Sequence, residues 1–262
     1  IWKGLVGSEM CIRDRKKDFS KASEIQKASS INFAKLLEMC ALTQPKMRIR
    51  FSTSNPQDMS LDVIKVMSKY ENICNYIHLP VQSGSNKVLK AMNRQHTREE
   101  YIKLVENIFQ IIPDCSISHD MISGFPNESE QDHNDTLSLM EKVKYSFGYM
   151  FKYSERPGTL AAKKLEDNID EETKSRRLSE IVELQQKHSL YRSKEFVGKT
   201  VEVLIEKESK KSNLHWAGRN QQNTTVVFPK ENYNIGDFVN VKINSCTSAT
   251  LIGEAIAFSK NN

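Results

Sequence analysis

The chain has 262 residues, which is enough for one large domain or two modest ones. Hydrophobic residues make up 38% and charged residues 27%, so a buried core is possible, while no apolar run approaches the ~20 residues of a membrane span. Only 10 glycines and 7 prolines occur, which excludes collagen-like and linker-like chains. The net charge of +5 permits a nucleic-acid partner without requiring one.

The first fifteen residues do not resemble the start of a domain. Residues 1–15 lack a starting Met and the order of a signal peptide, and GLVGSEMCIRDR resembles translated sequencing-adapter sequence. We expect 1–15 to be non-native and the native chain to begin near Lys16, as part of something longer. An ordinary flexible N-terminus stays open as the alternative.

The elements predicted in chain order alternate between helix and strand. Apolar spacing and turn signals predict strands at 47–54, 75–81, 115–122 and 147–153. They predict helices at 31–42, 60–70, 85–92, 98–112, 129–144 and 171–196. Ser60 is a candidate N-cap, and Thr97 with Glu100 forms a candidate capping box.

Strands that recur every ~30 residues, each followed by a helix, predict βαβ units and a parallel sheet. The functional loops of such a sheet lie at the C-terminal ends of its strands. Here those loops read STSNP, QSGS, SGFPNES and SERPGT, all rich in small and hydroxyl residues. Each alone is an ordinary turn; together they predict a ligand-binding α/β domain.

From about residue 194 the pattern changes to short alternating segments with Gly and Asn turns. This predicts a small antiparallel β-barrel domain. Basic residues there lie close in sequence to aromatic and amide residues, a combination that suits RNA backbone contact and base stacking. A soluble barrel with a mixed surface explains them equally well.

The sequence contains no strong pattern of metal ligands or of catalytic nucleophiles. The five cysteines are an odd number without a C-x-x-C pair, which favours a reducing cytoplasm and argues against a zinc or iron–sulfur site in this chain. His78 is expected to pack within a strand and His133 to lie on a solvated helix face, while His119, at a strand end, is the candidate worth testing. The run KSRR at 174–177 is expected on a solvated face.

Several segments together resemble the radical S-adenosylmethionine (SAM) methylthiotransferase family, in its tRNA-modifying branch. They are RIRFSTSNPQDM, HLPVQSGSNKVLKAMNRQHTREEY, DMISGFPNESE and FKYSERPGTLAA. HLPVQSGS followed by MNRxxTREEY is the most specific, and the resemblance covers about 16–258. The segment 194–262 resembles the TRAM module, an RNA-binding barrel.

The resemblance implies a partial radical SAM β/α barrel with parallel strands over 16–193, followed by a TRAM-like domain. Family members carry two 4Fe–4S clusters, one on a C-x-x-x-C-x-x-C loop, and neither cysteine set is present here. We therefore expect later βα units without the cluster loop, and no catalytic or metal-ligating residue in this piece. The strand at 48–53 is expected to be an unpaired edge beside an exposed apolar interior, which would favour aggregation or partial unfolding.

The family reaction adds a methylthio group to carbon 2 of an N6-prenylated adenosine beside the anticodon. The resemblance implies tRNA as partner, SAM as cofactor, a flavodoxin- or ferredoxin-like electron donor, a cytoplasmic monomer and no membrane. The SAM and substrate pocket is expected to be lined by Ser52, Ser54, Gln82, Ser83, Ser85, Asp120, Ile122 and Gly124. Tyr153 and Arg156 are expected near the substrate nucleoside. The expected RNA contacts are Lys207, Lys210, Lys211, Trp216, Arg219 and Phe228.

The chain departs from the family pattern at His119, Asn127 and Ser129. Asn127 matters most, because the usual Gly allows positive φ or close backbone approach. Three further interpretations stay open beside the enzyme. They are a methylthiotransferase of the threonylcarbamoyl-adenosine branch, a non-catalytic tRNA-binding fragment, and the product of an incomplete gene.

Overall fold

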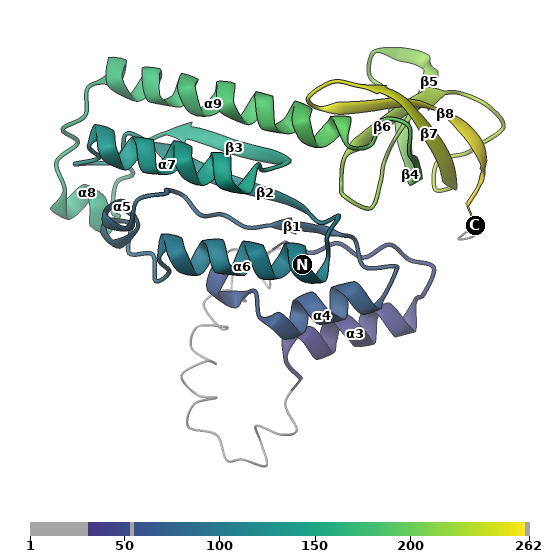
Figure 1. Ribbon diagram of the computed structural model, residues 1–262, viewed down its shortest axis with the longest axis horizontal. Helices are drawn as coiled ribbons and strands as arrows, with labels where there is room; N and C mark the ends of the chain where they lie inside the picture. Colours follow the sequence, from purple (N-terminus) through teal and green to yellow (C-terminus); the bar gives the residue numbers. More distant parts are fainter. Residues whose placement is uncertain (1–30, 53–54, 260–262) are drawn as a thin grey trace.

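The computed structural model describes residues 31–52 and 55–259 (Figure 1). The segment 1–15 and Ser54 lie outside these residues. An α/β part is joined by the long helix α9 (Glu171–Lys194) to a β-barrel (Figure 1). In the described ranges no helix is long and apolar enough to cross a membrane.

The α/β part contains a three-stranded parallel sheet in the order β1-β2-β3. Its strands are β1 (Tyr76–His78), β2 (Ser116–Ser123) and β3 (Phe147–Lys152). Ile77, Ile117 and Met121 are buried in the core beneath the helices, because alternate residues of a strand face the same side. The predicted parallel sheet is confirmed for these three strands.

Five of the predicted helices form on the α/β part before α9, and α8 (Leu160–Lys164) is additional. They are α3 (Phe33–Thr43), α4 (Leu61–Lys69), α5 (Asn86–Ala91), α6 (Arg98–Ile111) and α7 (Glu130–Val143). The predicted caps are confirmed: Ser60 caps α4, and Thr97 with Glu100 forms the capping box of α6. These caps satisfy N–H groups that would otherwise have no partner within the helix.

The strand predicted at 47–54 is wrong. Its described part contributes one isolated parallel bridge, Ile49 to Ile73, and a 3₁₀ turn η1 (Pro56–Asp58) follows. The flanking Arg48 and Arg50 reach toward the barrel instead, where their guanidinium groups donate to backbone carbonyls. Over residues 48–52 the expected unpaired edge strand therefore does not form.

The C-terminal part is a closed five-stranded barrel in the order β4-β5-β6-β8-β7. Its strands are β4 (Thr200–Ser209), β5 (Ser212–Arg219), β6 (Thr225–Pro229), β7 (Phe238–Cys246) and β8 (Thr250–Phe258). The prediction of an all-antiparallel barrel needs one correction, because β6 pairs with β8 in parallel. The barrel closes through this pair, since β7 lies between β4 and β8.

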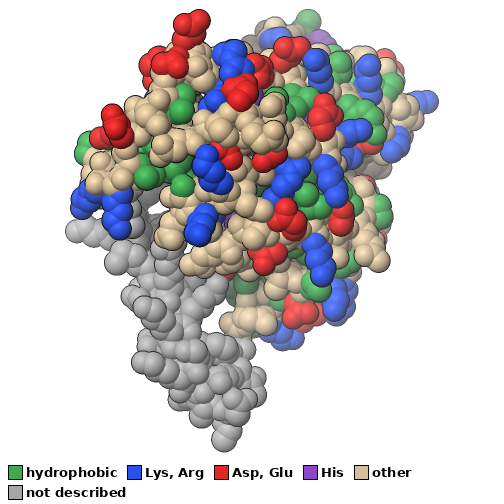
Figure 2. Space-filling view, turned by 60° about the vertical axis from the view of Figure 1, so that its left-hand side comes forward, with side chains coloured by type: hydrophobic (Ala, Val, Ile, Leu, Met, Phe, Trp, Pro, Cys, Tyr) green, Lys and Arg blue, Asp and Glu red, His purple; other side chains and the backbone are tan. Residues whose placement is uncertain are grey.

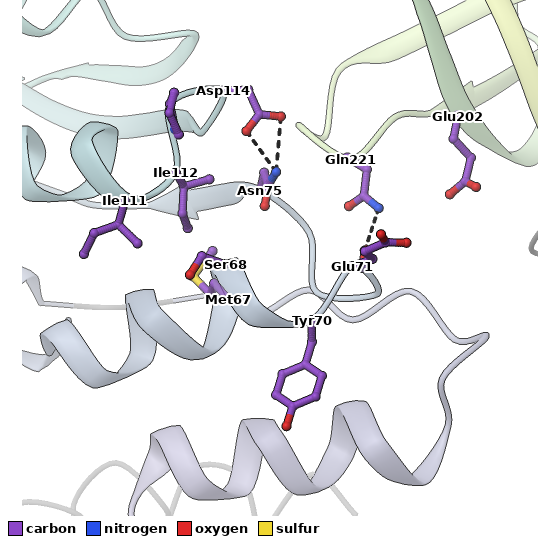
Figure 3. A pocket seen from close by; sticks show the side chains of 11 residues that line it. Met67, Ser68, Tyr70, Glu71, Asn75, Ile111, Ile112, Asp114, Glu202 and Gln221 are labelled. Atoms are coloured by element: carbon purple, nitrogen blue, oxygen red, sulfur yellow. Dashed lines mark hydrogen bonds between the residues drawn. The ribbon is translucent and has the colours of Figure 1, made fainter.

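The barrel is docked at the end of the sheet where the strands begin. Arg48 pairs with Glu202 at 2.8 Å, Gln221 donates to the Glu71 carbonyl at 2.8 Å, and Gln222 donates to Asp114 at 2.7 Å. We call this contact between the sheet and the barrel the seam. A cavity of about 370 Å³ lies along it (Figure 3). The opposite end of the sheet is thereby left clear of the barrel (Figure 1).

Candidate functional site

One face of the sheet carries a hydrogen-bonded chain of polar side chains. Ser118 Oγ lies 2.7 Å from Tyr76 Oη and 2.8 Å from His78 Nδ1. On the far side of the imidazole, His78 Nε2 lies 3.5 Å from Asp120 Oδ1. The register pairs His78 with Ser118 and Asp120 with Tyr149, so these residues share one face. His78 lies within β1 as predicted, and its imidazole also contacts side chains of the neighbouring strand β2.

Aromatic side chains continue this face onto β3. Phe147, Tyr149 and Phe151 are 49%, 51% and 54% exposed, although they belong to a strand beside a buried one. Phe147 and Tyr149 meet edge to face at 4.9 Å, and Ile122 of β2 is in register with Phe151. The face combines flat apolar surface with a carboxylate and hydroxyls, which suits a nucleoside. This is the exposed apolar interior predicted from the sequence.

The loops that follow β1, β2 and β3 converge at one edge of the sheet. Gln82 N–H donates to the Asp120 carbonyl at 2.9 Å, and Ile122 N–H donates to the Gln82 carbonyl at 3.0 Å. Tyr153 N–H donates to the Ser123 carbonyl at 2.8 Å. The helices α5 and α8, which follow two of the loops, lie at the same end of the sheet (Figure 1). Figure 2 turns that side toward the viewer, where acidic and basic side chains surround apolar patches.

Within the QSGS loop, Ser83 and Ser85 support the loop itself. Both are almost fully buried, and Ser85 Oγ donates to Asp132 of α7 at 2.6 Å. A Cβ at Gly84 would collide with the backbone of α7. Gln82 differs, because it has a positive φ of 76° and its side chain makes no hydrogen bond to a described residue. Gln82 is 7% exposed and pairs with Met121 in an isolated parallel bridge, so its place in the pocket stays a prediction.

The SGFPNES loop is shaped by positive-φ residues and a buried carboxylate. Gly124 has φ 74°, and its N–H donates to Glu128. Asn127 has φ 62° and exchanges hydrogen bonds with Asn168, so the left-handed conformation expected from the family's Gly is present without Gly. Burial raises the pKa of the Glu128 carboxyl.

Two cationic side chains of α9 contact that loop and support it. Arg177 lies 3.5 Å from Glu128 and donates to its carbonyl at 3.1 Å. Lys174, whose side chain is 3% exposed, pairs with Asp167 at 2.7 Å, and its methylenes fill the place where a side chain on Gly124 would lie. The prediction of a solvated face for residues 174–177 is therefore wrong for Lys174 and Arg177, because their carboxylate partners come from other segments.

The remaining pocket candidates lie around the same edge. Ser52 is exposed, and the next two residues, 53–54, lie outside the described ranges. Tyr153 is half-buried, with its ring 5.1 Å from that of Phe125 and the Lys174 ammonium 5.8 Å from its centre. Arg156 is exposed in the SERPGT loop, so it is available to a ligand but is not positioned by the fold.

The barrel presents only some of its predicted RNA contacts. Lys207, Lys210 and Lys211 are exposed on β4 and the turn after it. Trp216 is half-buried, with the Lys230 ammonium 4.5 Å from its ring centre. Arg219 is partly engaged with Asn223 and Glu206. Phe228 is fully buried in the barrel core, so we expect no stacking contact from it.

Among the described residues, the histidines and cysteines do not assemble a cluster site. His119 is fully buried against Gln185 at 2.8 Å, and burial lowers its pKa to about 4. His133, expected on a solvated face, is instead buried and pairs with Glu180 at 2.7 Å. Across residues 31–52 and 55–259 no group of three His, Cys, Asp or Glu side chains could hold a metal. The described residues therefore do not fit an iron–sulfur cluster.

The sequence alone does not identify Tyr76, His78, Ser118 and Tyr149 as candidate site residues. Their alternation along three strands was the available signal, but it shows which residues share a face only when the register is known. Lys174 and Arg177 carried no comparable signal, because a basic helix turn looks the same whether its partners are solvent or distant carboxylates.

Comparison with known proteins adds family and domain matches. The sequence profile of the radical SAM superfamily matches residues 21–140, and that of the TRAM domain matches 194–256. A tRNA-2-methylthio-N(6)-dimethylallyladenosine synthase of Christiangramia forsetii is 70% identical over 247 residues, covering 94% of this chain and 51% of the relative. The protein of the same name from Flavobacterium johnsoniae is 68% identical with the same coverage. The chain thus spans about half the length of the curated relatives it matches.

Among solved structures, the radical SAM enzyme coproporphyrinogen III oxidase (HemN) of Escherichia coli aligns with 73% of this chain and 52% of its own. The identity is 14% and the TM-score 0.49, a similarity that carries no functional argument.

Proposed function

We propose that this chain, which is similar over 94% of its length to a synthase of the radical SAM methylthiotransferase family, forms the substrate-holding part of a tRNA-modifying enzyme. The reaction would add a methylthio group to carbon 2 of an N6-prenylated adenosine beside the anticodon. The observation that carries the proposal is the open sheet face with its converging loops, in a chain 70% identical to a synthase of that modification.

The residues of this chain supply binding and orientation. Asp120 and Gln82 offer hydrogen-bonding groups at the strand-end edge, while Ile122 and the rings of Tyr149 and Phe151 offer apolar surface for a base. The same face suits the adenosyl group of SAM, which supplies the radical in this family when a cluster is bound. The residues described here do not fit that cluster, so we infer that the chain alone performs no radical step.

The barrel would hold the RNA. An exposed basic stretch is formed by Lys207, Lys210 and Lys211. Trp216 on β5 lies beside it, in register with Glu208 of β4. Basic residues beside an aromatic ring suit phosphate contact and stacking at modest, salt-sensitive affinity. We expect the anticodon stem-loop as ligand, a cytoplasmic setting, a monomer, and a flavodoxin- or ferredoxin-like electron donor for the intact enzyme.

A chimera tests the enzyme assignment. Residues 16–262 would replace the matching part of the Christiangramia relative in a bacterial strain that lacks its own methylthiotransferase. We expect mass spectrometry of tRNA hydrolysates to detect 2-methylthio-N6-prenyladenosine. Methylthiolation of threonylcarbamoyl-adenosine instead would assign the chain to that branch of the family. A soluble, folded chimera that yields neither nucleoside would refute the enzyme reading and favour a non-catalytic tRNA-binding piece.

A second experiment tests whether the chain is inactive alone. The 262-residue protein would be reconstituted with iron and sulfide under reducing conditions and supplied with SAM. We expect no 5′-deoxyadenosine above a protein-free control. Clear, protein-dependent deoxyadenosine formation would disprove the inference.

A further inference from the structure

The cavity in the seam lies between the two parts of the chain, and its wall comes from both. One side is formed where α4 and α6 end, and the other by Glu202 of β4 and by Gln221, which follows β5 (Figure 3). Its volume of about 370 Å³ is that of a small-molecule site, and such sites are common between domains. None of the described strand-end residues lines it, so it is separate from the candidate site.

The helix side of the cavity is largely apolar. It is lined by Met67 of α4 and by Ile111 and Ile112 at the end of α6. Figure 3 shows these side chains together on one side, away from Glu202. Both helices end here, and the last carbonyl groups of a helix carry a partial negative charge. This side therefore offers apolar surface in surroundings that favour a cation.

Every charged residue that lines the cavity is acidic. The three are Glu71, Asp114 and Glu202. Glu202 is paired with Arg48 at 2.8 Å. Within the described part of the chain, Asp114 accepts hydrogen bonds from side-chain amides at 2.7 to 3.2 Å and forms no ion pair. The amides hold the Asp114 carboxylate in place without neutralising its charge.

The barrel side of the cavity has a second acceptor that lacks a donor. The amide nitrogen of Gln221 donates to the Glu71 carbonyl at 2.8 Å, which Figure 3 marks. The amide oxygen Oε1 of Gln221 is buried and accepts no hydrogen bond from a described residue. Buried polar atoms are normally paired. An ammonium group carries three donors and no acceptor, so it matches an amide oxygen beside a carboxylate.

We propose that the seam cavity binds a small aliphatic amine. Its ammonium group contacts the Asp114 carboxylate and Gln221 Oε1, and its hydrocarbon chain lies against Met67, Ile111 and Ile112. Asp114 and Gln221 belong to the same part of the wall, because Gln222 donates to Asp114 at 2.7 Å. The inference does not depend on the proposed function. Because the two sides of the cavity belong to different domains, the bound amine strengthens the contact between them.

Three probes separate the charged and the apolar parts of the ligand. Butylammonium, methylammonium and 1-butanol would each be titrated calorimetrically into the full 262-residue chain at matched ionic strength. We expect butylammonium to bind about tenfold more tightly than methylammonium, because its three additional methylene groups partly leave water. We expect it to bind about fivefold more tightly than 1-butanol, as one ion pair at an exposed carboxylate provides.

Two variants and a control locate the site. Asp114→Asn removes the charge but keeps the shape, and should reduce the preference for butylammonium over 1-butanol to less than twofold. Ser68→Trp places a ring at the cavity wall without changing any charge, and should abolish binding. Glu172→Gln, an exposed change in the first turn of α9, should leave binding unchanged. Thermal melting of each variant verifies folding.

Four outcomes would overturn the proposal. The first is no preference of the wild-type chain for butylammonium over 1-butanol, including no binding of either. The second is an equal loss in Asp114→Asn and Glu172→Gln, which would indicate general surface charge. The third is undiminished binding in a folded Ser68→Trp chain. The fourth is displacement of butylammonium by an equal concentration of magnesium chloride, which would assign the cavity to an inorganic cation.

Discussion

Buried cations hold this molecule together at both ends of its parallel sheet, and the two ends use them differently. At the strand-end edge, Lys174 and Arg177 pair with carboxylates and thereby shape the loops of the candidate site. At the opposite edge, the buried Arg48 pairs with Glu202 and donates to a barrel carbonyl, and the partly exposed Arg50 donates to another, so they fasten one domain to the other. A buried ion pair is weak evidence for stability as such. The comparison teaches that here each one fixes the position of a segment.

The largest effect is expected from Arg177→Met. The substitution leaves the Glu128 carboxylate, 3% exposed, without its cation, which costs about 3–5 kcal/mol in the free energy of unfolding. Urea denaturation of the whole chain measures it. Adding Glu128→Gln should recover part of the loss, and Arg176→Met, whose side chain is 46% exposed, should cost less than about 1 kcal/mol. Equal losses in Arg177→Met and Arg176→Met would show that the buried ion pair contributes no more to the free energy of unfolding than the exposed one.

Arg48→Met should have the next largest effect, at the domain seam. The Arg48 side chain is 3% exposed, but that of its partner Glu202 is 17% exposed. Without Arg48 the Glu202 carboxylate can still reach water, so the loss in the free energy of unfolding falls to about 2 kcal/mol. We expect faster proteolysis between α9 and β4, because the barrel is held less firmly. Lys65→Met, an exposed change of the same kind on α4, is the matched control. Unchanged proteolysis would show that the seam does not depend on Arg48.

Acid should weaken the α/β part through His119. Because burial lowers the folded pKa to about 4 from 6.5, the unfolded chain binds more protons between these values. The stabilising effect is therefore complete above pH 6.5 and is lost progressively as pH falls toward 4, by about 2 kcal/mol at pH 5. Unfolding free energies at pH 7 and pH 5 should differ less in His119→Asn than in wild type. Parallel pH curves for the two proteins would contradict this.

The smallest effect on folding is expected from the exposed cations of the barrel. Lys210→Gln with Lys211→Gln should leave the melting temperature unchanged, while weakening tRNA binding several-fold and reducing the salt slope by about 1.5. Filter binding at several salt concentrations measures both quantities. Lys163→Gln with Lys164→Gln on α8 serves as the charge-matched control. Unaltered affinity would remove this stretch from the RNA interface.

Local sequence signals predicted much of the fold. The strands β1 to β3 and the capped helices α4 and α6 follow from apolar periodicity and from Ser60 and Thr97, whose effects act within a few residues. The strand at 47–54 failed because Arg48 and Arg50 have stronger partners on a barrel that lies about 150 residues later in the chain. Separation along the chain also explains His133, whose partner Glu180 lies 47 residues later on another helix.

In the candidate site too, features set by neighbouring residues were predicted and features set by distant residues were not. The sequence alone determined that polar loops end successive strands, that the second part is a small barrel, and which family the motifs resemble, because these features depend on residues close together in the chain. Only the tertiary structure decided that Ser83, Ser85 and Phe228 are buried and that His78 joins Ser118 and Asp120. Burial and pairing between segments depend on packing, and no local pattern of residues records which distant side chain will fill a given space.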